Sequence, residues 1–192
     1  MATKNLKGTQ TEKNIVGSYL NETQSYARYT YYAQQADKEQ YFPVGVIFRE
    51  TADNELRHAK VFLKMLGGGK VIGTVSVDAL PPTTTAENLE ISIEEEAIGG
   101  VKDYHAYAAV AEKEGFPEIA SHFLAIAEAE QHHLDRFKLL LEQVRNGTVW
   151  KRDKPIRWRC LVCGYIHEGT TPPEECPACD HPYQHYMALD IE

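Results

Sequence analysis

The sequence predicts a mainly α-helical fold: a four-helix bundle with a long crossover between helices two and three, followed by a small module with short β-strands. Apolar residues recur at helical spacing in four long stretches. The pattern of the first two stretches repeats in the last two at offsets of 74 and 75 residues. All four cysteines lie within residues 160–179. We therefore expect the bundle to span residues 1–147, a linker 148–156 and the small module 157–192.

The first predicted helix covers residues 11–36, and a polar break at 37–40 ends it. The second begins at Pro43, which suits a first helical turn, and ends at Leu66 before three glycines. Glu55 lies on the apolar face of the second helix. The predicted inward face of the first helix also carries a carboxylate, and consists of Ile15, Tyr19, Glu22, Tyr26, Tyr29 and Ala33.

Residues 70–84 have no helical period and contain two consecutive prolines, so we interpret them as a long crossover. Thr84 and Glu87 have the spacing of a capping box, which predicts a third helix over 85–114. Glu96 lies on the apolar face of this helix. A carboxylate on a predicted buried face needs a partner, because burying an unpaired charge is costly.

The fourth predicted helix covers residues 117–145 and has the most regular apolar pattern in the chain. Glu130 and His133 lie on its inward face. The two helical hairpins also match each other, since Glu22 corresponds to Glu96 at an offset of 74 residues and Glu55 to Glu130 at 75. Agreement at core and polar positions together indicates an internal duplication.

Each hairpin therefore offers one Glu on its first helix and a Glu-x-x-His on its second. A carboxylate and an imidazole three residues apart share one helix face and can bind one ion. Four buried carboxylates require neutralisation, which two divalent ions provide, and this ligand chemistry favours iron or manganese. The arrangement is similar to the ferritin-like di-iron carboxylate proteins. The predicted ligands are Glu22, Glu55, His58, Glu96, Glu130 and His133.

The sequence also allows predictions for three side chains near these ligands. His132 does not keep the ligand spacing, so we expect it to face outward or sideways. Tyr29 and Tyr104 are expected mostly in the core, where a hydroxyl near the cluster can orient a carboxylate or a bound peroxide.

The cysteines form two Cys-x-x-Cys pairs separated by twelve residues, Cys160 with Cys163 and Cys176 with Cys179. Four thiolates at this spacing predict a tetrahedral metal site, and sulfur ligands alone do not distinguish zinc from iron. A structural zinc ribbon therefore stays an alternative. Gly164-Tyr165 and Pro177 resemble the knuckles of rubredoxin, which implies an Fe(Cys)4 centre that carries one electron.

Composition excludes several classes of protein. The formal net charge of −8 over 192 residues argues against a nucleic-acid partner, which requires a basic surface. Charged residues interrupt the apolar stretches too often for a membrane span, and the polar first ten residues lack the pattern of a signal peptide. We therefore expect a cytoplasmic protein, and in a reducing compartment the clustered cysteines indicate a metal site rather than a disulfide framework.

With both parts in view, the chain resembles rubrerythrin over essentially its whole length, and residues 6–8, 11–14, 50–53 and 58–60 agree with that family as well. The resemblance implies a peroxidase of oxidative-stress defence. Two carboxylate-bridged iron ions would reduce hydrogen peroxide to water, and the Fe(Cys)4 iron would return electrons singly. It also implies an electron-donating partner, either a separate NADH-linked reductase or a rubredoxin, and a head-to-tail homodimer.

One position departs from the family. Rubrerythrins usually carry another Glu three residues after the third-helix ligand, and one iron moves between that Glu and the second-helix His. Here the position is Gly99. Either the iron stays on His58 in both redox states, or Glu95 or water substitutes. The remaining set is symmetric, like the ferroxidase centre of a bacterioferritin, so ferroxidase or iron-handling activity is the alternative function.

Overall fold

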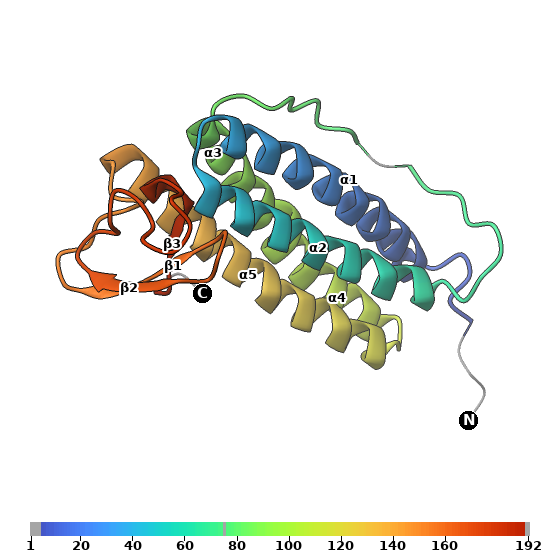
Figure 1. The fold of residues 1–192 in the computed structure, drawn as a ribbon. Helices are drawn as coiled ribbons and strands as arrows, with labels where there is room; N and C mark the ends of the chain where they lie inside the picture. Colours follow the sequence, from blue (N-terminus) through green and yellow to red (C-terminus); the bar gives the residue numbers. More distant parts are fainter. Residues whose placement is uncertain (1–4, 75, 191–192) are drawn as a thin grey trace.

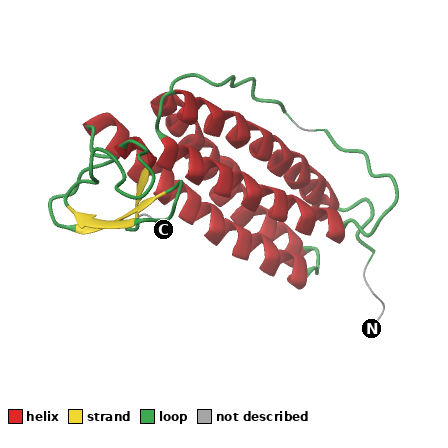
Figure 2. Ribbon diagram, in the orientation of Figure 1, coloured by secondary structure: helices red, strands yellow, loops and turns green. Residues whose placement is uncertain are grey.

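The computed structural model describes residues 5–74 and 76–190, and shows a helical bundle with a small β module at one end (Figures 1 and 2). Residues 1–4 and 191–192, the predicted ends of the bundle and the module, lie outside the described residues. The mainly α fold is confirmed. The helical elements are α1 (Gln10–Lys38), α2 (Phe42–Met65), α3 (Thr85–Glu95), η1 (Glu96–Lys102), α4 (Asp103–Lys113) and α5 (Pro117–Asn146).

Local sequence signals account for the helix ends. The side chain of Thr9 accepts a hydrogen bond from the backbone N–H of Glu12 and caps α1. Thr84 and Glu87 form the expected capping box before α3. Gly147 adopts a left-handed conformation, with φ of 65°, and ends α5. These caps set the lengths of the helices that carry the inward carboxylates.

The expectation of one continuous α-helix over 85–114 is wrong in the middle of that stretch. A seven-residue π-helical segment, η1, separates α3 from α4 and begins at Glu96. A π-segment accommodates one residue more than an α-helix of the same length, and such segments are frequent at functional sites. The extra residue explains why Glu22 matches Glu96 at an offset of 74 while Tyr29 matches Tyr104 at 75.

The predicted inward face of α1 is wrong at Tyr26, which is 36% exposed. Ser25 and Arg28 are buried beside it instead. The buried positions advance through Glu22, Ser25 and Tyr29, in steps of three and four that follow the 3.6-residue period of a straight helix. The small Ser25 side chain therefore faces the bundle, and the larger Tyr26 faces out.

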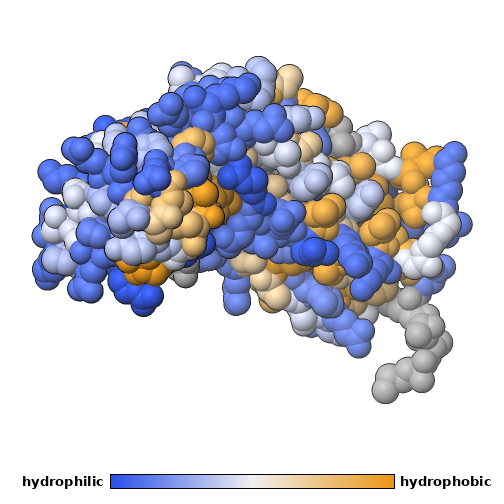
Figure 3. Space-filling view, viewed as in Figure 1, coloured by the Kyte–Doolittle hydropathy of each residue, from blue (hydrophilic) through white to orange (hydrophobic). Residues whose placement is uncertain are grey.

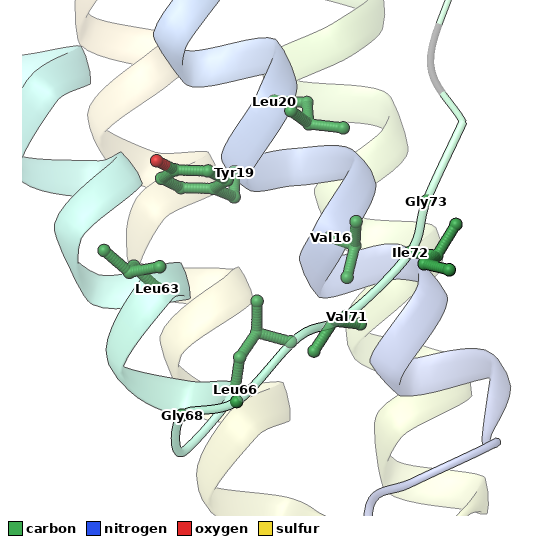
Figure 4. Close-up of a pocket in the computed structure, with 10 residues that line it drawn as sticks. Val16, Tyr19, Leu20, Leu63, Leu66, Gly68, Val71, Ile72 and Gly73 are labelled. Atoms are coloured by element: carbon green, nitrogen blue, oxygen red, sulfur yellow. The ribbon is translucent and has the colours of Figure 1, made fainter.

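The crossover runs in extended conformation along the outside of α1, from the end of α2 to the start of α3 (Figure 1). A Cβ at Gly73 would lie 2.2 Å from Val16 Cγ1, so only glycine permits this close approach to α1. Farther along, the Tyr32 hydroxyl donates to the carbonyl of Leu80 at 3.1 Å. An apolar pocket of about 410 Å³ lies where the crossover begins, between α1, α2 and residues 68–73. Figure 4 shows the side chains that line it.

Two aromatic cores fill the bundle, and the pseudo-twofold symmetry of the hairpins relates them. One lies toward the C-terminal module and contains Tyr29, Phe48 and Phe137. The other contains Phe62, Tyr104 and Phe123 near the opposite end. The inward carboxylates occupy the layer between these cores, as the contacts below show.

The C-terminal module contains the three-stranded antiparallel sheet β2-β1-β3, built from β1 (Ile156–Cys160), β2 (Ile166–Gly169) and β3 (Tyr186–Ala188), with a short turn η2 (Tyr183–His185). The module packs against the start of α2. Tyr41 stacks on Trp150 with ring centroids 5.7 Å apart. Phe42 stacks on His185 at 4.0 Å. These aromatic contacts fix the module on the end of the bundle.

The surface is mixed in character. Hydrophilic side chains cover most of the face shown in Figure 3, with hydrophobic patches over the bundle. Within the described residues, no helix combines the length and the apolar character that crossing a bilayer requires.

Candidate metal centres

The structure brings all six predicted bundle ligands together from α1, α2, η1 and α5. They form two groups of four, and within each group the potential ligand atoms all lie within 4.8 Å of one another. Glu55 and Glu130 belong to both groups, as carboxylates that bridge two ions do. The first group is completed by Glu22 and His58, and the second by Glu96 and His133.

The distances show how the two shared carboxylates serve both groups. Nδ1 of His58 lies 3.1 Å from Glu55 Oε2 and 3.0 Å from Glu130 Oε1. Nδ1 of His133 lies 2.7 Å from Glu130 Oε2 and 3.2 Å from Glu55 Oε1. Each shared carboxylate therefore directs one oxygen to each imidazole. This is a bridging arrangement between two positions related by the pseudo-twofold axis.

Burial of the carboxyl groups shifts their pKa values. The four carboxyl-bearing residues are between 1% and 4% exposed. Burial, together with neighbouring carboxylates, raises the pKa of Glu22 and of Glu96 well above the ordinary value. Burial alone would raise the pKa of Glu55 too, but hydrogen bonds from His133 and His58 outweigh it and lower that pKa to about 2.

The imidazoles respond in the opposite direction. Burial alone would lower their pKa values, but hydrogen bonds to Glu130 and Glu55 outweigh it. The pKa of His58 rises to about 10 and that of His133 to about 9. The cluster thus gathers protons to balance its carboxylates. A site with this demand for positive charge fits two divalent cations, which deliver the same charge.

The donor set also fits metal ions. Glu55 Oε1 is fully buried, and the imidazole nitrogen that faces it at 3.2 Å, Nδ1 of His133, lies nearer to Glu130 Oε2, at 2.7 Å. A buried carboxylate oxygen that must share its donor is costly, and a cation bound there would remove the cost. Carboxylate oxygen with one imidazole per position suits iron or manganese.

Tyr29 and Tyr104 lie beside the cluster, as the sequence predicted. The Tyr29 hydroxyl donates to Glu96 Oε1 at 2.5 Å, and the Tyr104 hydroxyl donates to Glu22. Burial, with the nearby carboxylate charges, raises the pKa of both tyrosines well above 10, so both hydroxyls stay protonated donors. The rings are held by pairs of phenylalanines at centroid distances of 5.2–6.0 Å: Phe48 with Phe137, and Phe62 with Phe123.

The π-segment η1 approaches α5 closely at Gly100. A Cβ on Gly100 would lie 2.7 Å from both Cβ and Cγ of Glu130, and 3.3 Å from Glu96 Oε2. A side chain at this position would displace the shared carboxylate. Gly100 is therefore a site residue that the sequence reasoning missed, although two consecutive glycines inside a predicted helix were a signal for it.

Two other neighbours of the cluster were also missed. The Asn54 amide nitrogen lies 3.3 Å from His133 Nε2 and restrains that ring. Arg28 is 8% exposed and pairs with Glu95, the residue before the ligand position Glu96. A charged residue close to the inward face of the first helix was the available signal for Arg28. No sequence pattern pointed to Asn54.

The remaining expectations concern side chains around the ligands. His132 is exposed, as predicted from its spacing. Gly99 leaves the usual carboxylate position without a side chain, and a Cβ there would lie 3.3 Å from Asn21 Nδ2. Glu95 is close to the cluster but is engaged by the buried Arg28.

The four cysteines converge at the edge of the C-terminal module. Sγ of Cys160 lies 3.7 Å from Sγ of Cys179, and Sγ of Cys163 lies 3.6 Å from Sγ of Cys176. A tetrahedral ion with metal–sulfur bonds of about 2.3 Å separates its sulfurs by about 3.8 Å. Gly164, with φ of 79°, makes the tight turn after the first pair. The thiols are therefore arranged as a tetrahedral metal site.

Comparisons with known proteins agree with both sites. The family model described as rubrerythrin matches residues 13–84 and 87–159, and the model of the rubrerythrin rubredoxin-like domain matches residues 158–187. The chain is 41% identical to rubrerythrin of Nitratidesulfovibrio vulgaris over 188 residues, which cover 98% of each chain. It is also 41% identical to rubrerythrin of Clostridium perfringens over 187 residues, covering 95% of this chain and 96% of the relative.

Solved structures give the same result. The structure titled fully reduced nigerythrin (all ferrous) aligns with a TM-score of 0.65 and 25% identity, over 98% of this chain and 90% of nigerythrin. Mycobacterium tuberculosis bacterioferritin shares the fold, with a TM-score of 0.63 at 15% identity, over 71% of this chain and 86% of its own. The chain belongs to the rubrerythrin family, with a di-iron carboxylate site in a ferritin-like bundle and a four-cysteine rubredoxin-like site.

Proposed function

We propose that this protein is a non-haem di-iron peroxidase that reduces hydrogen peroxide to water in oxidative-stress defence. The observation that carries the proposal is the pairing, in one chain, of two four-ligand groups sharing Glu55 and Glu130 with a four-thiolate site. The carboxylate and imidazole ligands of the bundle would hold iron able to supply two electrons to peroxide, and the four cysteines would hold an iron that carries single electrons.

We assign the ligands from the geometry. Glu22 and His58 would hold one iron, Glu96 and His133 the other, and Glu55 and Glu130 both. The rubredoxin-type iron would be held by Cys160, Cys163, Cys176 and Cys179.

The residues around the site would control protons and ligand positions. Reduction of hydrogen peroxide to two water molecules consumes two electrons and two protons, so the site needs a proton supply. Tyr29 and Tyr104 remain protonated and hydrogen-bond to the terminal carboxylates Glu96 and Glu22. Each hydroxyl holds its carboxylate in place and is a donor near the position where peroxide would bind.

Gly99 bears on whether ligands exchange during turnover. The Arg28–Glu95 ion pair favours the case in which His58 stays a ligand in both redox states. To replace His58, Glu95 would have to leave the buried guanidinium of Arg28 unpaired. Water remains the other candidate. Cryogenic spectroscopy of the diferric and diferrous protein labelled with ¹⁵N-histidine tests this. Equal numbers of nitrogen ligands in both states support the proposal, and loss of one on oxidation contradicts it.

The peroxidase activity is tested with the iron-loaded, reduced protein. Hydrogen peroxide is added in rapid mixing, and oxidation of the bundle iron is followed by its visible absorption. Oxidation should be fast in the wild type and lost in Glu130→Ala. Glu128→Ala is the matched control, because Glu128 is an exposed glutamate on the same helix. Oxidation of the wild type no faster than that of Glu130→Ala would refute the proposal.

A second candidate is ferroxidase or iron-handling activity. The symmetric ligand set and the bacterioferritin-like fold favour it. Light scattering during aerobic iron loading distinguishes the two functions. Large particles with mineral cores would support iron storage, whereas a dimer that holds only a few iron ions per chain would exclude storage.

We further infer an electron-donating reductase or a rubredoxin as partner, a head-to-tail homodimer and a cytoplasmic location. The four thiols support the location, since a reducing compartment keeps them available for metal. Sedimentation equilibrium of the holoprotein tests the dimer. Metal analysis with a visible spectrum tests the iron in the cysteine site, and a colourless protein containing zinc would indicate a structural ribbon instead.

A further inference from the structure

A polar cavity of about 600 Å³ lies between α1, the end of α3, η1 and the start of α4, and the crossover forms its outer wall. A second cavity of about 10 Å³ lies inside the carboxylate cluster. Both cavities are lined by Asn21, Glu95 and Tyr104. The larger polar cavity therefore adjoins the buried site through these three side chains.

We propose that the polar cavity is the route by which divalent cations enter the bundle site. The carboxyl ligands are at most 4% exposed, so an ion must pass between protein atoms to reach them. Tyr104 lines the passage and its hydroxyl donates to Glu22. The inner end of the route thus opens on Glu22, one of the ligands at the cluster.

Charge in the polar cavity suits a cation. Its wall carries the carboxylates of Asp78, Glu94 and Asp103 in addition to the paired Glu95, and, among the described residues, a single lysine, Lys13. The excess of negative charge would concentrate divalent cations at the entrance.

A buried hydroxyl gives a second, independent indication. Ser18 is 2% exposed and lines the cavity, yet its Oγ has no hydrogen-bond partner within the described residues. A buried hydroxyl without a partner is uncommon and implies a water or an ion next to it. Oxygen atoms of this kind replace hydration water as a cation moves inward. The inner cavity has room for about one water molecule, so most of the hydration shell must be lost before it.

Gly99 keeps the inner end open. It lines the polar cavity, and a Cβ added there would lie 3.3 Å from Asn21 Nδ2, at the edge that the two cavities share. A longer side chain would extend into the passage. The missing carboxylate at this position thus gives the chain an entrance beside its metal site.

Cation uptake by the full-length apoprotein tests the route. The cysteine site is first filled with Zn²⁺, and Co²⁺ is then added in rapid mixing while its visible absorption in the bundle is followed. Gly99→Leu should slow uptake by about tenfold, since a blocked passage must wait for local opening of the bundle. The final spectrum and stoichiometry should match the wild type, because every ligand is retained. Equal uptake rates would overturn the proposal and indicate entry elsewhere, for example past His58, which is 14% exposed at its side chain.

Matched variants separate blocking from disturbance of the fold. Ala106→Leu adds bulk at an exposed position of α4 that does not line the cavity, and should leave uptake within about twofold. Asp78 is exposed on the crossover, outside the bundle, so Asp78→Asn should leave the bundle folded. It should slow uptake about twofold at low ionic strength and not in 1 M salt. An Asp78→Asn rate equal to wild type at low salt would count against the route even if Gly99→Leu fails to fold. The assay contains no peroxide, so its result tests the entry route independently of the peroxidase proposal.

Discussion

Loading the bundle with two divalent cations should release at least two protons at pH 7, and up to four. Four groups in the cluster have a raised pKa: the carboxyls of Glu22 and Glu96, and the imidazoles of His58 and His133. Burial among like charges favours the neutral form of the two carboxyls, and hydrogen bonds to carboxylates keep the two imidazoles charged at pH 7. Each must lose its proton to bind metal, and two divalent ions then replace the four protons with equal charge.

The release should fall as pH rises, and the imidazole pKa values give the size of the change. At pH 9.5, a pKa of about 9 leaves His133 about one-quarter protonated, and a pKa of about 10 leaves His58 about three-quarters protonated. The histidines then contribute about one proton in place of two, so their share of the release is about halved. Metal affinity should rise over the same interval, because fewer protons compete.

The assay mixes Co²⁺ with the full-length protein in weak buffer and follows a pH indicator. Prior filling of the cysteine site with Zn²⁺ removes the contribution of the thiols. His133→Gln should lower the release by about one proton at pH 7, whereas His132→Gln should leave it unchanged, since His132 is exposed and belongs to neither ligand group. A release of one proton or fewer by the wild type would refute the charge balance derived for the cluster.

Gly100→Ala places a Cβ 2.7 Å from Glu130 and should cost about 1–3 kcal/mol, so an unchanged thermal midpoint in calorimetry would contradict the close approach. Tyr104→Phe removes the donor to Glu22 and should weaken cation binding about tenfold in chelator competition, where the half-buried Tyr107→Phe should match wild type. Cys163→Ser should weaken and shift the thiolate-to-iron absorption and leave the bundle metal content intact; an unchanged spectrum would exclude Cys163 as a ligand.

The sequence predicted the six inward residues because two independent patterns agreed on them. Helical spacing placed each Glu and His on an apolar face, and the duplication related Glu55 to Glu130 and His58 to His133. The structure brings all of them into one cluster. Spacing along a helix defines a face only to within one residue, however. Tyr26 was therefore placed inside by the stepwise pattern, while packing selected the smaller Ser25.

Contacts between different helices were harder to predict. Asn54 approaches His133 across the space between α2 and α5, and Arg28 reaches Glu95 from α1. Neither contact follows from a regular spacing of residues in the sequence, because both depend on how the helices pack. The polar cavity has the same origin, since its wall combines α1, the crossover and η1. Sequence periodicity describes single elements and says little about the space between them.

The difference between the two offsets in the duplication reflects one structural feature, the π-segment η1, and this feature connects these observations. Glu22 and Glu96 are related by 74 residues, but Tyr29 and Tyr104 by 75, so one residue has been added between the ligand and the tyrosine of the second hairpin. A regular α-helix would rotate Tyr104 by about 100° for that residue. The π-segment absorbs it, and Tyr104 still reaches Glu22 as Tyr29 reaches Glu96. The added residue lies in the segment that contains Gly99 and Gly100, where the backbone approaches Glu130 on one side and borders the polar cavity on the other. The asymmetry between the hairpins thus preserves the symmetric hydrogen bonds at the metal site while creating an entrance on one side of it.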